Sequence, residues 1–378
     1  MDSLYFGAVG LLVSVVCWWV YNVCYSLFFS PLRNIPGPLV LQLFPVYELL
    51  FRMAGTFNWK EREYLIAYGG VYRKGWRKVI FASEEAMNEI YSTQAYAKSD
   101  FYLALQTQGH NLFSTMDKDF HRERKRIMAP SFSQKEIESF DEDIRHEVVT
   151  VATSIIQSMA KDKVPIDMYR LFSSFTMDVI GLLGFGRNFH TLRNGPHPAE
   201  KWFQQSNQRI AFEIFFPLLR LIPNLPLSNL KRLGLQAAHD TKLSLDRRSI
   251  MASLINAKDP DTGSKLSDTD LADEAILQIF AGSDSTANSM TWALYFIVKH
   301  PNVYDKVVNE LNEKFPSLNH EITMGDCKQG SLPYLDAAIK ESMRVMPAAS
   351  GALERLVPQG GRTIDGHFLP GGVILFCL

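Results

Sequence analysis

The chain has 378 residues, of which 47% are hydrophobic, 21% charged and 12% aromatic, a composition typical of a globular protein. Its formal net charge of −1 at pH 7 argues against nucleic acid as the main partner. Four cysteines do not make a disulfide framework, which favours a reduced body that faces the cytosol.

Residues 1–33 predict a membrane anchor and its flank. No charged residue lies between Asp2 and Arg33, and Leu4–Phe29 is dominated by apolar and aromatic side chains. About 20 such residues cross the hydrocarbon core as a helix. A cleaved signal peptide is the alternative, but a basic start and a small-x-small cleavage site are missing. We expect an uncleaved transmembrane helix with a cytosolic body, residues 34–378, because the first basic residue follows the helix.

The body is predicted to be mainly α with a smaller β part, an α+β fold. Pro36-Gly37-Pro38 is a stiff elbow, because proline cannot continue a helix. Alternation of apolar and basic residues around Gly75 predicts a hairpin over residues 69–81. Ser83 can cap a following helix. Further helices are expected over residues 134–160, 168–184, 199–215, 234–257, 267–299, 302–314 and 333–345, and strands within 353–357 and 362–376.

The helix expected over residues 267–299 is the most informative element. Ser267 and Asp270 resemble an N-terminal cap, and His300-Pro301 ends the pattern. Its middle reads Phe280-Ala-Gly-Ser-Asp-Ser-Thr286, where a glycine costs about 1 kcal/mol relative to alanine. Either something bulky packs against these small residues, or two helices cross closely there and the polar groups are satisfied locally. Both interpretations remain open at this point.

Two charged motifs carry little information alone. Glu341 and Arg344 can pair at i, i+3 for about 0.2–0.5 kcal/mol, but such pairs are common in a chain with 40 acidic and 39 basic residues. The run His121–Arg126 could bind phosphate, a carboxylate or an acidic protein face. A solvated basic helix face is the simpler interpretation of that run.

The order of these motifs resembles the cytochrome P450 family over essentially the whole chain. The motifs are the anchor, Pro36-Gly37-Pro38, His121 to Lys125-Arg126 and Pro130-Ser-Phe132, Thr176-Met-Asp-Val-Ile180, Phe185-Gly186, Ala281–Thr286, Glu341-Ser-Met-Arg344, Arg355, and Gly366-His-Phe-Leu-Pro370-Gly-Gly. The resemblance implies a cytochrome P450-like fold that is incomplete at the C-terminus, and a haem b cofactor. It also implies a microsomal, fungal-type haem-thiolate monooxygenase of secondary metabolism, which inserts one oxygen atom of O2 into a small hydrophobic substrate.

The resemblance assigns catalytic roles within the long helix. Ala281 and Gly282 would leave room for the haem face and for oxygen. Asp284 and Ser285, with Thr286 beside them, match an acid–alcohol pair that relays protons, which contributes about 10²–10⁴-fold to a rate. The family usually has threonine where Ser285 stands. Serine keeps the hydroxyl but lacks the methyl group that fixes its rotamer, so looser positioning is expected.

The remaining roles that the resemblance implies concern binding and structure. Glu341 and Arg344 would form a buried structural pair behind the haem, and losing one partner of such a pair costs about 3–5 kcal/mol. Cofactor binding would fall to His121, Lys125, Arg126 and Arg355, together with Ala281 and Gly282. Lysine at 125 replaces the usual arginine fork with a point charge, so that contact should be weaker.

The cysteine thiolate that a P450 needs under the iron is missing from the pattern. In the family it lies in a Phe-x-x-Gly-x-Arg-x-Cys loop well beyond the Glu341–Arg344 helix. Cys377 lies in an apolar strand without that glycine and arginine, so we expect a small buried hydrophobe there and no protein metal ligand. The chain is therefore expected to be a truncated monooxygenase. The alternative is a truncated, catalytically inactive P450-like membrane protein that lacks the haem ligand, and a helical scaffold without redox ancestry is disfavoured.

The resemblance also implies partners and a location. The other basic residues of the His121 helix would face NADPH–cytochrome P450 reductase. Residues 101–113 and 209–226, rich in Phe, Leu and Ile, match regions that line the family's pocket, so the substrate should be apolar. The expected location is the endoplasmic reticulum membrane, as a single-pass protein with a cytosolic body.

Overall fold

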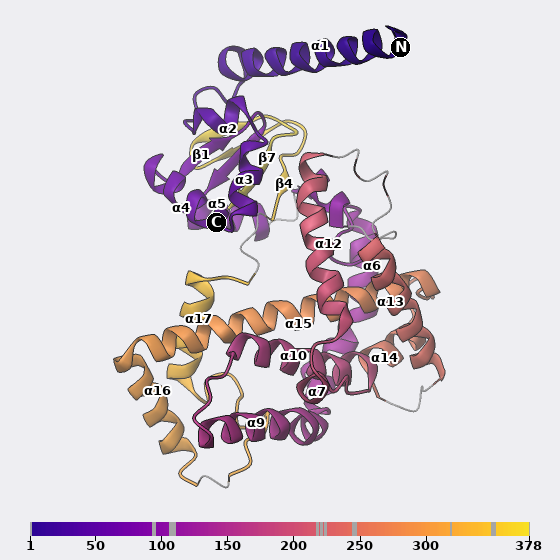
Figure 1. Ribbon diagram of the computed structural model, residues 1–378, viewed down its shortest axis with the longest axis vertical. Coiled ribbons are helices and arrows are strands. Elements are labelled where there is room, and N and C mark those ends of the chain that lie inside the picture. Colours follow the sequence, from indigo (N-terminus) through magenta and orange to yellow (C-terminus); the bar gives the residue numbers. More distant parts are fainter. Residues whose placement is uncertain are drawn as a thin grey trace. The chain divides into compact units, whose positions relative to one another are not determined.

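The computed structural model describes residues 2–92, 96–105, 111–216, 219, 222, 225–243, 248–317, 320–348 and 353–377 (Figure 1). They gather into two compact units. Unit 1 consists of Met1–Leu105, Ile210–Leu219 and Ser350–Leu378, and unit 2 of Gln106–Arg209 and Arg220–Ala349. Both units are described separately below. Helices outweigh strands, so the predicted α+β class is confirmed.

Unit 1 contains short helices and a small mixed sheet. Its helices are α1 (Asp2–Cys24), the π-helical turn η1 (Tyr25–Phe29), α2 (Leu39–Leu43), α3 (Tyr47–Met53), α4 (Phe57–Ala67), α5 (Glu84–Ser92) and η2 (Asp100–Leu105). Its strands are β1 (Val71–Lys74), β2 (Lys78–Phe81), β3 (Ala97–Lys98), β4 (Arg355–Leu356), β5 (Arg362–Ile364), β6 (His367–Leu369) and β7 (Ile374–Cys377). The predicted hairpin is β1–β2, and Ser83 caps α5 by accepting the amide of Ala86 at 2.9 Å.

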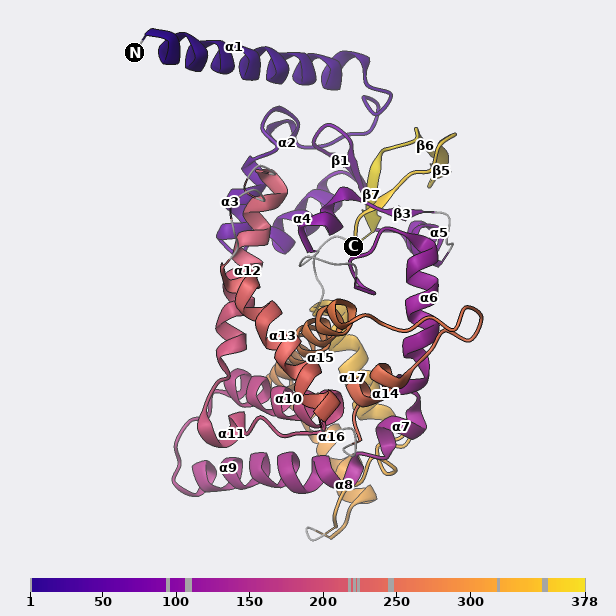
Figure 2. The same ribbon diagram turned by 90° about the vertical axis from the view of Figure 1, so that its right-hand side faces the viewer.

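The sheet of unit 1 joins distant parts of the chain. Its order is β1-β2-β7-β4-β3, with β7 parallel to β2 and antiparallel to β4, while β5 and β6 form a separate hairpin (Figure 2). Its two faces are covered by buried side chains, among them Val79, Phe81 and Leu375 on one and Tyr72, Ile80 and Phe376 on the other. This pairing brings the strand after Leu353 beside residues 97–98.

The predicted elbow is anchored on β1. The amide of Arg73 donates to the carbonyl of Pro36 at 2.7 Å. A Cβ at Gly37 would lie 2.1 Å from the carbonyl oxygen of Arg73, a distance that real Cβ contacts do not reach. Glycine is therefore required here because the two backbones approach so closely.

The N-terminal segment is helical, as predicted. Within the described part of the chain, no helix combines the length and the apolar character that a membrane span requires. The expected transmembrane helix over Leu4–Phe29 is therefore not supported. The second half of α1 instead packs on unit 1: Trp18 meets Trp76 edge-on at 5.1 Å between ring centroids, and Trp19 stacks on Phe44 at 5.4 Å.

The described residues of unit 2 form helices and their connections, with no strand among them. It contains α6 (Lys118–Met128), η3 (Ala129–Phe132), α7 (Gln134–Glu138), α8 (Asp141–Ile144), η4 (Arg145–Val149), α9 (Thr150–Lys161), α10 (Met168–Phe185), α11 (Thr191–Asn194), most of α12 (Pro198–Phe215), α13 (Leu225–Leu243), α14 (Ile250–Asn256), α15 (Asp268–Lys299), α16 (Pro301–Lys314) and α17 (Pro333–Val345).

Most predicted helices of unit 2 are confirmed, and two are divided. The segment 134–160 breaks near Ser139, whose hydroxyl donates to the carbonyl of Glu136, and then continues through a π-helical turn. Such side-chain-to-backbone bonds compete with helix continuation. The segment 234–257 forms α13 and α14 instead of one helix. The expected pocket regions 101–113 and 209–226 fall partly outside the described residues.

Helix α15 is the centre of unit 2. It lies along α10 in both views (Figures 1 and 2) and also packs on α13. A Cβ at Gly234 of α13 would lie 2.6 Å from the carbonyl oxygen of Ala272, so the two helices cross closely there. The surrounding core includes Met177, Met251, Leu254, Leu271, Ala275 and Ile279. A rigid α15 thus carries the polar motif that the sequence singled out.

Candidate functional site

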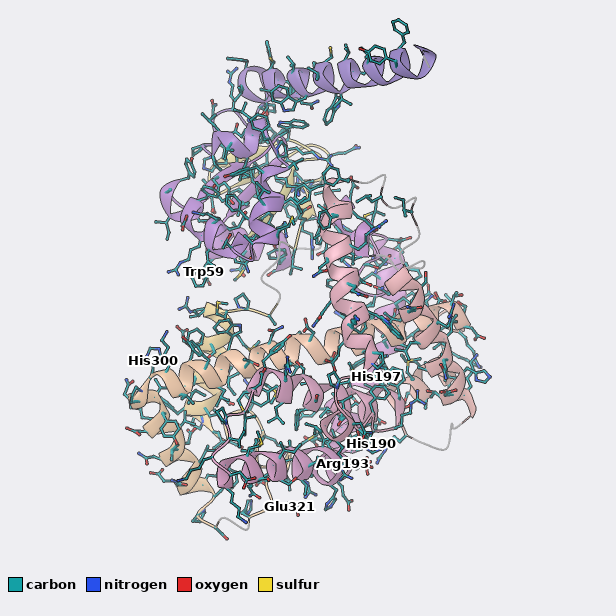
Figure 3. All side chains as sticks on the ribbon, viewed as in Figure 1. Trp59, His190, Arg193, His197, His300 and Glu321 are labelled. Atoms are coloured by element: carbon teal, nitrogen blue, oxygen red, sulfur yellow. The ribbon has the colours of Figure 1, made fainter. Side chains whose placement is uncertain are left out.

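The ends of α15 are those predicted from the sequence. The amide of Asp270 donates to the Ser267 hydroxyl at 3.2 Å, and the amide of Ser267 donates to the Asp270 carboxylate at 3.0 Å. This reciprocal capping box satisfies amides that otherwise lack helical partners. The helix ends at Lys299, and His300, which is labelled in Figure 3, follows it directly before Pro301.

One face of the central motif of α15 is a helix crossing. Gly282 faces α10, where a Cβ would lie 2.8 Å from the Cδ1 atom of Ile180. Ser283 and Ala287 are buried on the same side, and the Ser283 hydroxyl donates to the carbonyl of Ile279 at 2.6 Å. At Gly282, α15 and α10 therefore cross closely, which is the second of the two interpretations left open by the sequence. Ile180 fills the space that was expected there for haem.

The opposite face of the motif is exposed. Ala281, Asp284 and Ser285 lie on it at helical spacing i, i+3 and i+4, and Thr286 beside them is exposed too. The Ser285 hydroxyl donates to the carbonyl of Ala281 at 2.5 Å. A carboxyl and a hydroxyl thus stand next to each other on a rigid helix, an arrangement that can hold and pass a proton.

The electrostatics of Asp284 suit that role. Desolvation by its surroundings raises the pKa of the Asp284 carboxyl, and the neighbouring Tyr169 side chain of α10 partly offsets that rise. Within the described residues, no lysine or arginine forms an ion pair with this carboxyl. Asp284 therefore accepts a proton more readily than an ordinary aspartate.

The basic residues predicted on α6 are only partly available for a cofactor. Arg126 forks onto Asp259 at 2.6 and 3.0 Å and also reaches Asp261 at 2.5 Å. Two carboxylates of its own unit thus already hold Arg126, and its assignment to cofactor binding stays a prediction. His121 is half-buried, and Lys125 is exposed with no ion pair to any described residue.

The Glu341–Arg344 pair forms as predicted, but it is not buried. Two bonds of 2.7 Å join the guanidinium of Arg344 to the carboxylate of Glu341. The side chains are 61% and 71% exposed, because they lie on the outer face of α17, from which only Ser342 is buried. The expectation of a buried pair is corrected, and an exposed pair of this kind contributes little to stability.

Arg355 lies in unit 1, in a second candidate site. The sequence predicted Arg355 there but not its neighbour Lys98. Arg355 is paired across the strands with Lys98 of β3, so two cations stand directly opposite each other. Arg355 donates to the Tyr102 hydroxyl at 3.0 Å, and its guanidinium lies 5.4 Å from the Tyr91 ring centroid. No carboxylate among the described residues pairs with Arg355.

This cation pair has the character of an anion-binding site. Burial, and then the charge of Arg355, lowers the pKa of Lys98 to about 8. Like charges placed directly opposite each other destabilise a sheet unless an anion offsets them. Lys98 was missed because nothing in its local sequence marks it. Only the pairing of β3 with β4, more than 250 residues apart in the chain, brings it to Arg355.

The residues present fit haem in part. The cations at Lys98 and Arg355 suit its two carboxylates. A thiolate ligand must be deprotonated. Burial and the neighbouring Asp326 raise the pKa of the Cys327 thiol, and Cys377 donates its thiol to the carbonyl of Ser83 at 3.4 Å. These two cysteines therefore do not fit the iron.

Comparison with known proteins gives a consistent result. A model of the cytochrome P450 family matches residues 38–378. The chain is 26% identical to cytochrome P450 monooxygenase helB3 of Aspergillus fumigatus, over 93% of this chain and 72% of the relative. It is 29% identical to cytochrome P450 monooxygenase atnE of Emericella nidulans, over 99% of this chain and 77% of the relative. Cytochrome P450 monooxygenase LUC2 of a Fusarium species is 26% identical, with coverages of 92% and 70%.

The family match covers far more than half of the chain, and the polar motif of α15 and Arg355 both lie inside it. The protein belongs to the cytochrome P450 family, whose members are haem-containing monooxygenases.

Proposed function

We propose that this chain acts in a monooxygenase that inserts one oxygen atom of O2 into a small hydrophobic substrate. The observation that carries the proposal is the exposed face of α15, where Asp284 and Ser285 stand together on a capped helix. When bound, haem b would supply the iron at which O2 is activated. The part of this chain in that reaction is to hold and deliver protons.

Asp284 and Ser285 would share the proton delivery. The raised pKa of Asp284 lets its carboxyl carry a proton, and the neighbouring Ser285 hydroxyl can receive one at its oxygen while donating its own. To do so the Ser285 hydroxyl must release the carbonyl of Ala281. Thr286, one residue on, is the remaining hydroxyl of the motif and serves as the second candidate donor.

Lys98 and Arg355 would hold the carboxylates of the haem. Each supplies a cation at the β3–β4 pairing, and Arg355 offers a planar fork that suits a carboxylate. The family expectation also places His121 and Lys125 of α6 among the cofactor contacts. Lys125 is exposed and without an ion pair in the described part of the chain, which leaves it free for such a contact.

An apolar substrate is supported by a cavity in unit 1. Its volume is about 420 Å³, and its walls include the aromatic rings of Trp18, Trp19, Phe44, Trp76 and Phe215. Phe215 belongs to the segment 209–226, which the sequence predicted to line a pocket. Aromatic walls of this kind favour flat, hydrophobic molecules. We further propose secondary metabolite biosynthesis as the setting, since the similar curated proteins are fungal P450 monooxygenases.

The proposed partner and location follow from the electron supply. Family members receive electrons from a reductase, and NADPH–cytochrome P450 reductase is the proposed donor. The cytosolic face of the endoplasmic reticulum would place the chain beside it. Exposed apolar side chains along α1, including Phe6, Val13 and Tyr21, support attachment to a membrane surface. Fractionation of cells, followed by a carbonate wash of the membranes, tests this location.

Co-expression with the reductase in haem-sufficient cells tests the function. The expected result is an NADPH-dependent product that carries one oxygen atom from labelled O2. Asp284→Asn should lower the rate of that oxygen insertion by roughly 10²-fold, since it removes a positioned proton donor. A chain that binds haem without oxygen insertion would contradict the proposal and favour the alternative, a catalytically inactive P450-like protein.

A further inference from the structure

The aromatic cavity of unit 1 is built from parts of the chain that are distant in sequence. Its lining residues come from the second half of α1, from α2 and α3, from the β1–β2 hairpin and from the end of α12, and all of them belong to unit 1. Trp18 of α1 meets Trp76 of the hairpin turn, and Trp19 stacks on Phe44 with 24° between the ring planes. Contacts between rings therefore hold α1 against the hairpin and the α2–α3 segment.

Two of the three indole N–H groups in this wall are already engaged. Trp19 donates to the carbonyl of Leu43 at 2.7 Å, and Trp76 donates to the carbonyl of Gln42 at 2.7 Å. These bonds fix the two rings and leave neither N–H for a ligand. Trp19 and Trp76 therefore offer a ligand apolar surface alone.

Four charged residues line the cavity among those that the structure describes, and three of them already have buried partners. The ammonium of Lys74 lies 3.0 Å from the carboxylate of Glu48 and 2.8 Å from that of Glu61, and all three side chains are less than a tenth exposed. Lys78 pairs with Glu354, whose carboxylate is buried as well. The charges of Lys74, Glu48 and Lys78 are thus balanced within the protein.

Arg77 is the fourth charged residue, and its partner holds it weakly. Its one ion pair with a described residue joins it to Asp100 at 3.4 Å, and the two side chains are 59% and 63% exposed. An exposed pair of this kind contributes little, so a carboxylate from a ligand can take the place of Asp100. The backbone of Arg77 is fixed, because its carbonyl accepts the amide of Ile374 in β7 at 2.8 Å. A planar guanidinium on a rigid hairpin can bind a carboxylate through two parallel bonds.

We propose that this cavity takes an aromatic carboxylic acid, whose flat apolar body lies among the rings and whose carboxylate binds Arg77. Arg77 is then the residue that determines specificity, because a neutral molecule of the same shape fills the same apolar space without forming the charge-assisted bonds. The inference names the substrate class of the proposed monooxygenase and rests on that function.

Calorimetric titration of the full chain without haem tests this specificity. The probes are 2-naphthoate and 2-naphthalenemethanol, which have nearly the same shape and differ in charge. We expect 2-naphthoate to bind roughly 10-fold more tightly than the alcohol, since two charge-assisted bonds are added. Arg77→Gln should remove this preference by weakening the binding of 2-naphthoate while that of the alcohol stays the same.

Asp100→Asn changes the affinity in the opposite direction. It removes the carboxylate that competes for Arg77, so 2-naphthoate should bind more tightly and the alcohol should bind as before. A variant that merely damaged the fold would not bind a ligand more tightly. Arg62→Gln, at an exposed position on α4, is the matched control and should change neither affinity.

Absence of 2-naphthoate binding, equal affinities for the two probes, or a preference that survives Arg77→Gln would overturn the proposal. An unchanged affinity for 2-naphthoate in Asp100→Asn would also overturn it. Failure of the proposed function would look different, because the chain would bind 2-naphthoate with this preference while no oxygen is inserted into any substrate.

Discussion

Glu274 shows how one buried acid makes stability depend on pH. It lies in α15, where one carboxylate oxygen accepts the Leu112 amide at 2.9 Å and the other has no hydrogen-bond partner among the residues that the structure describes. Burial is the main reason that its pKa rises to about 7. The folded chain therefore holds this proton to higher pH than the unfolded chain. Stability should fall as pH rises from about 4.5, its ordinary value, to about 7.

Glu274→Gln should remove this pH dependence, because glutamine keeps an acceptor for the Leu112 amide and carries no charge. The free energy of unfolding should rise at pH 8 by at most about 3 kcal/mol and change little at pH 4.5. Urea denaturation at the two pH values measures it. Glu313→Gln, an exposed position on α16, is the control and should leave the pH dependence as it is. The same pH slope in Glu274→Gln and in the parent chain would count against this account.

The pKa of Asp259 is shifted in the opposite direction, below its ordinary value. Burial raises the pKa of its carboxyl, but the Thr262 amide, the Arg126 guanidinium and the Asp261 amide together lower it to about 2. Its contribution to stability is therefore present above about pH 4 and is lost as pH falls towards 2. Arg126→Gln should move the midpoint of acid unfolding to higher pH, which circular dichroism during an acid titration measures. If Arg126→Gln left the midpoint of acid unfolding unchanged, this structural role of Arg126 would be wrong.

At the scale of elements, Arg73 ties the end of α1 to the β1–β2 hairpin. Its side chain is fully buried and donates to the carbonyl of Ser26 at 2.8 Å and to the hydroxyls of Ser26 and Ser30 at 2.9 and 3.2 Å. It also donates to the carbonyls of Gly75 and Trp76. All of these acceptors are neutral carbonyl or hydroxyl oxygens, and none of them is a carboxylate.

Arg73→Met should destabilise unit 1 by at least about 3 kcal/mol, because several buried acceptors lose their donor. Arg73→Lys should be intermediate, since lysine carries three donors in place of five. Urea denaturation gives the free energy, and limited proteolysis of residues 24–34 reports release of α1. Arg62→Met, at an exposed position on α4, is the control. Equal protease resistance in Arg73→Met and Arg62→Met would contradict this role of Arg73.

The elements that could be predicted were those marked by residues close together in the sequence. The capping residues Ser267 and Asp270 and the terminal His300-Pro301 fixed both ends of α15, and the basic alternation around Gly75 fixed the hairpin. The break near Ser139 escaped because the periodicity continues across it, although the hydroxyl of Ser139 turns to the backbone. The early helices α2 to α4 were not predicted because their segments are short and irregular.

The candidate site was predictable where one helix carries it. Ala281, Asp284 and Ser285 share a face because of their spacing alone. Lys98 was not predictable, because it reaches Arg355 only through pairing between strands distant in the chain. The exposure of Glu341 and Arg344 was likewise invisible, since an i, i+3 spacing does not say which side of α17 faces solvent.

At the scale of the whole molecule, the two units contribute different chemistry to a member of the P450 family. Unit 2 provides the face of α15 that carries Asp284 and Ser285. Unit 1 provides the cation pair of Lys98 and Arg355 and an aromatic cavity. The family match spans residues of both units, so each unit holds part of the cytochrome P450 domain.

The central claim is that this chain binds haem through the carboxylates of the cofactor, and titration of the full chain with haem tests it most directly. The change in Soret absorbance gives the affinity. Arg355→Gln and Lys98→Gln should each weaken haem binding by roughly 10- to 100-fold, because each removes a charge-assisted hydrogen bond. Arg362→Gln, at an exposed position on β5, removes the same charge and should not change the affinity. Haem affinity that is equal in all four chains would contradict the claim.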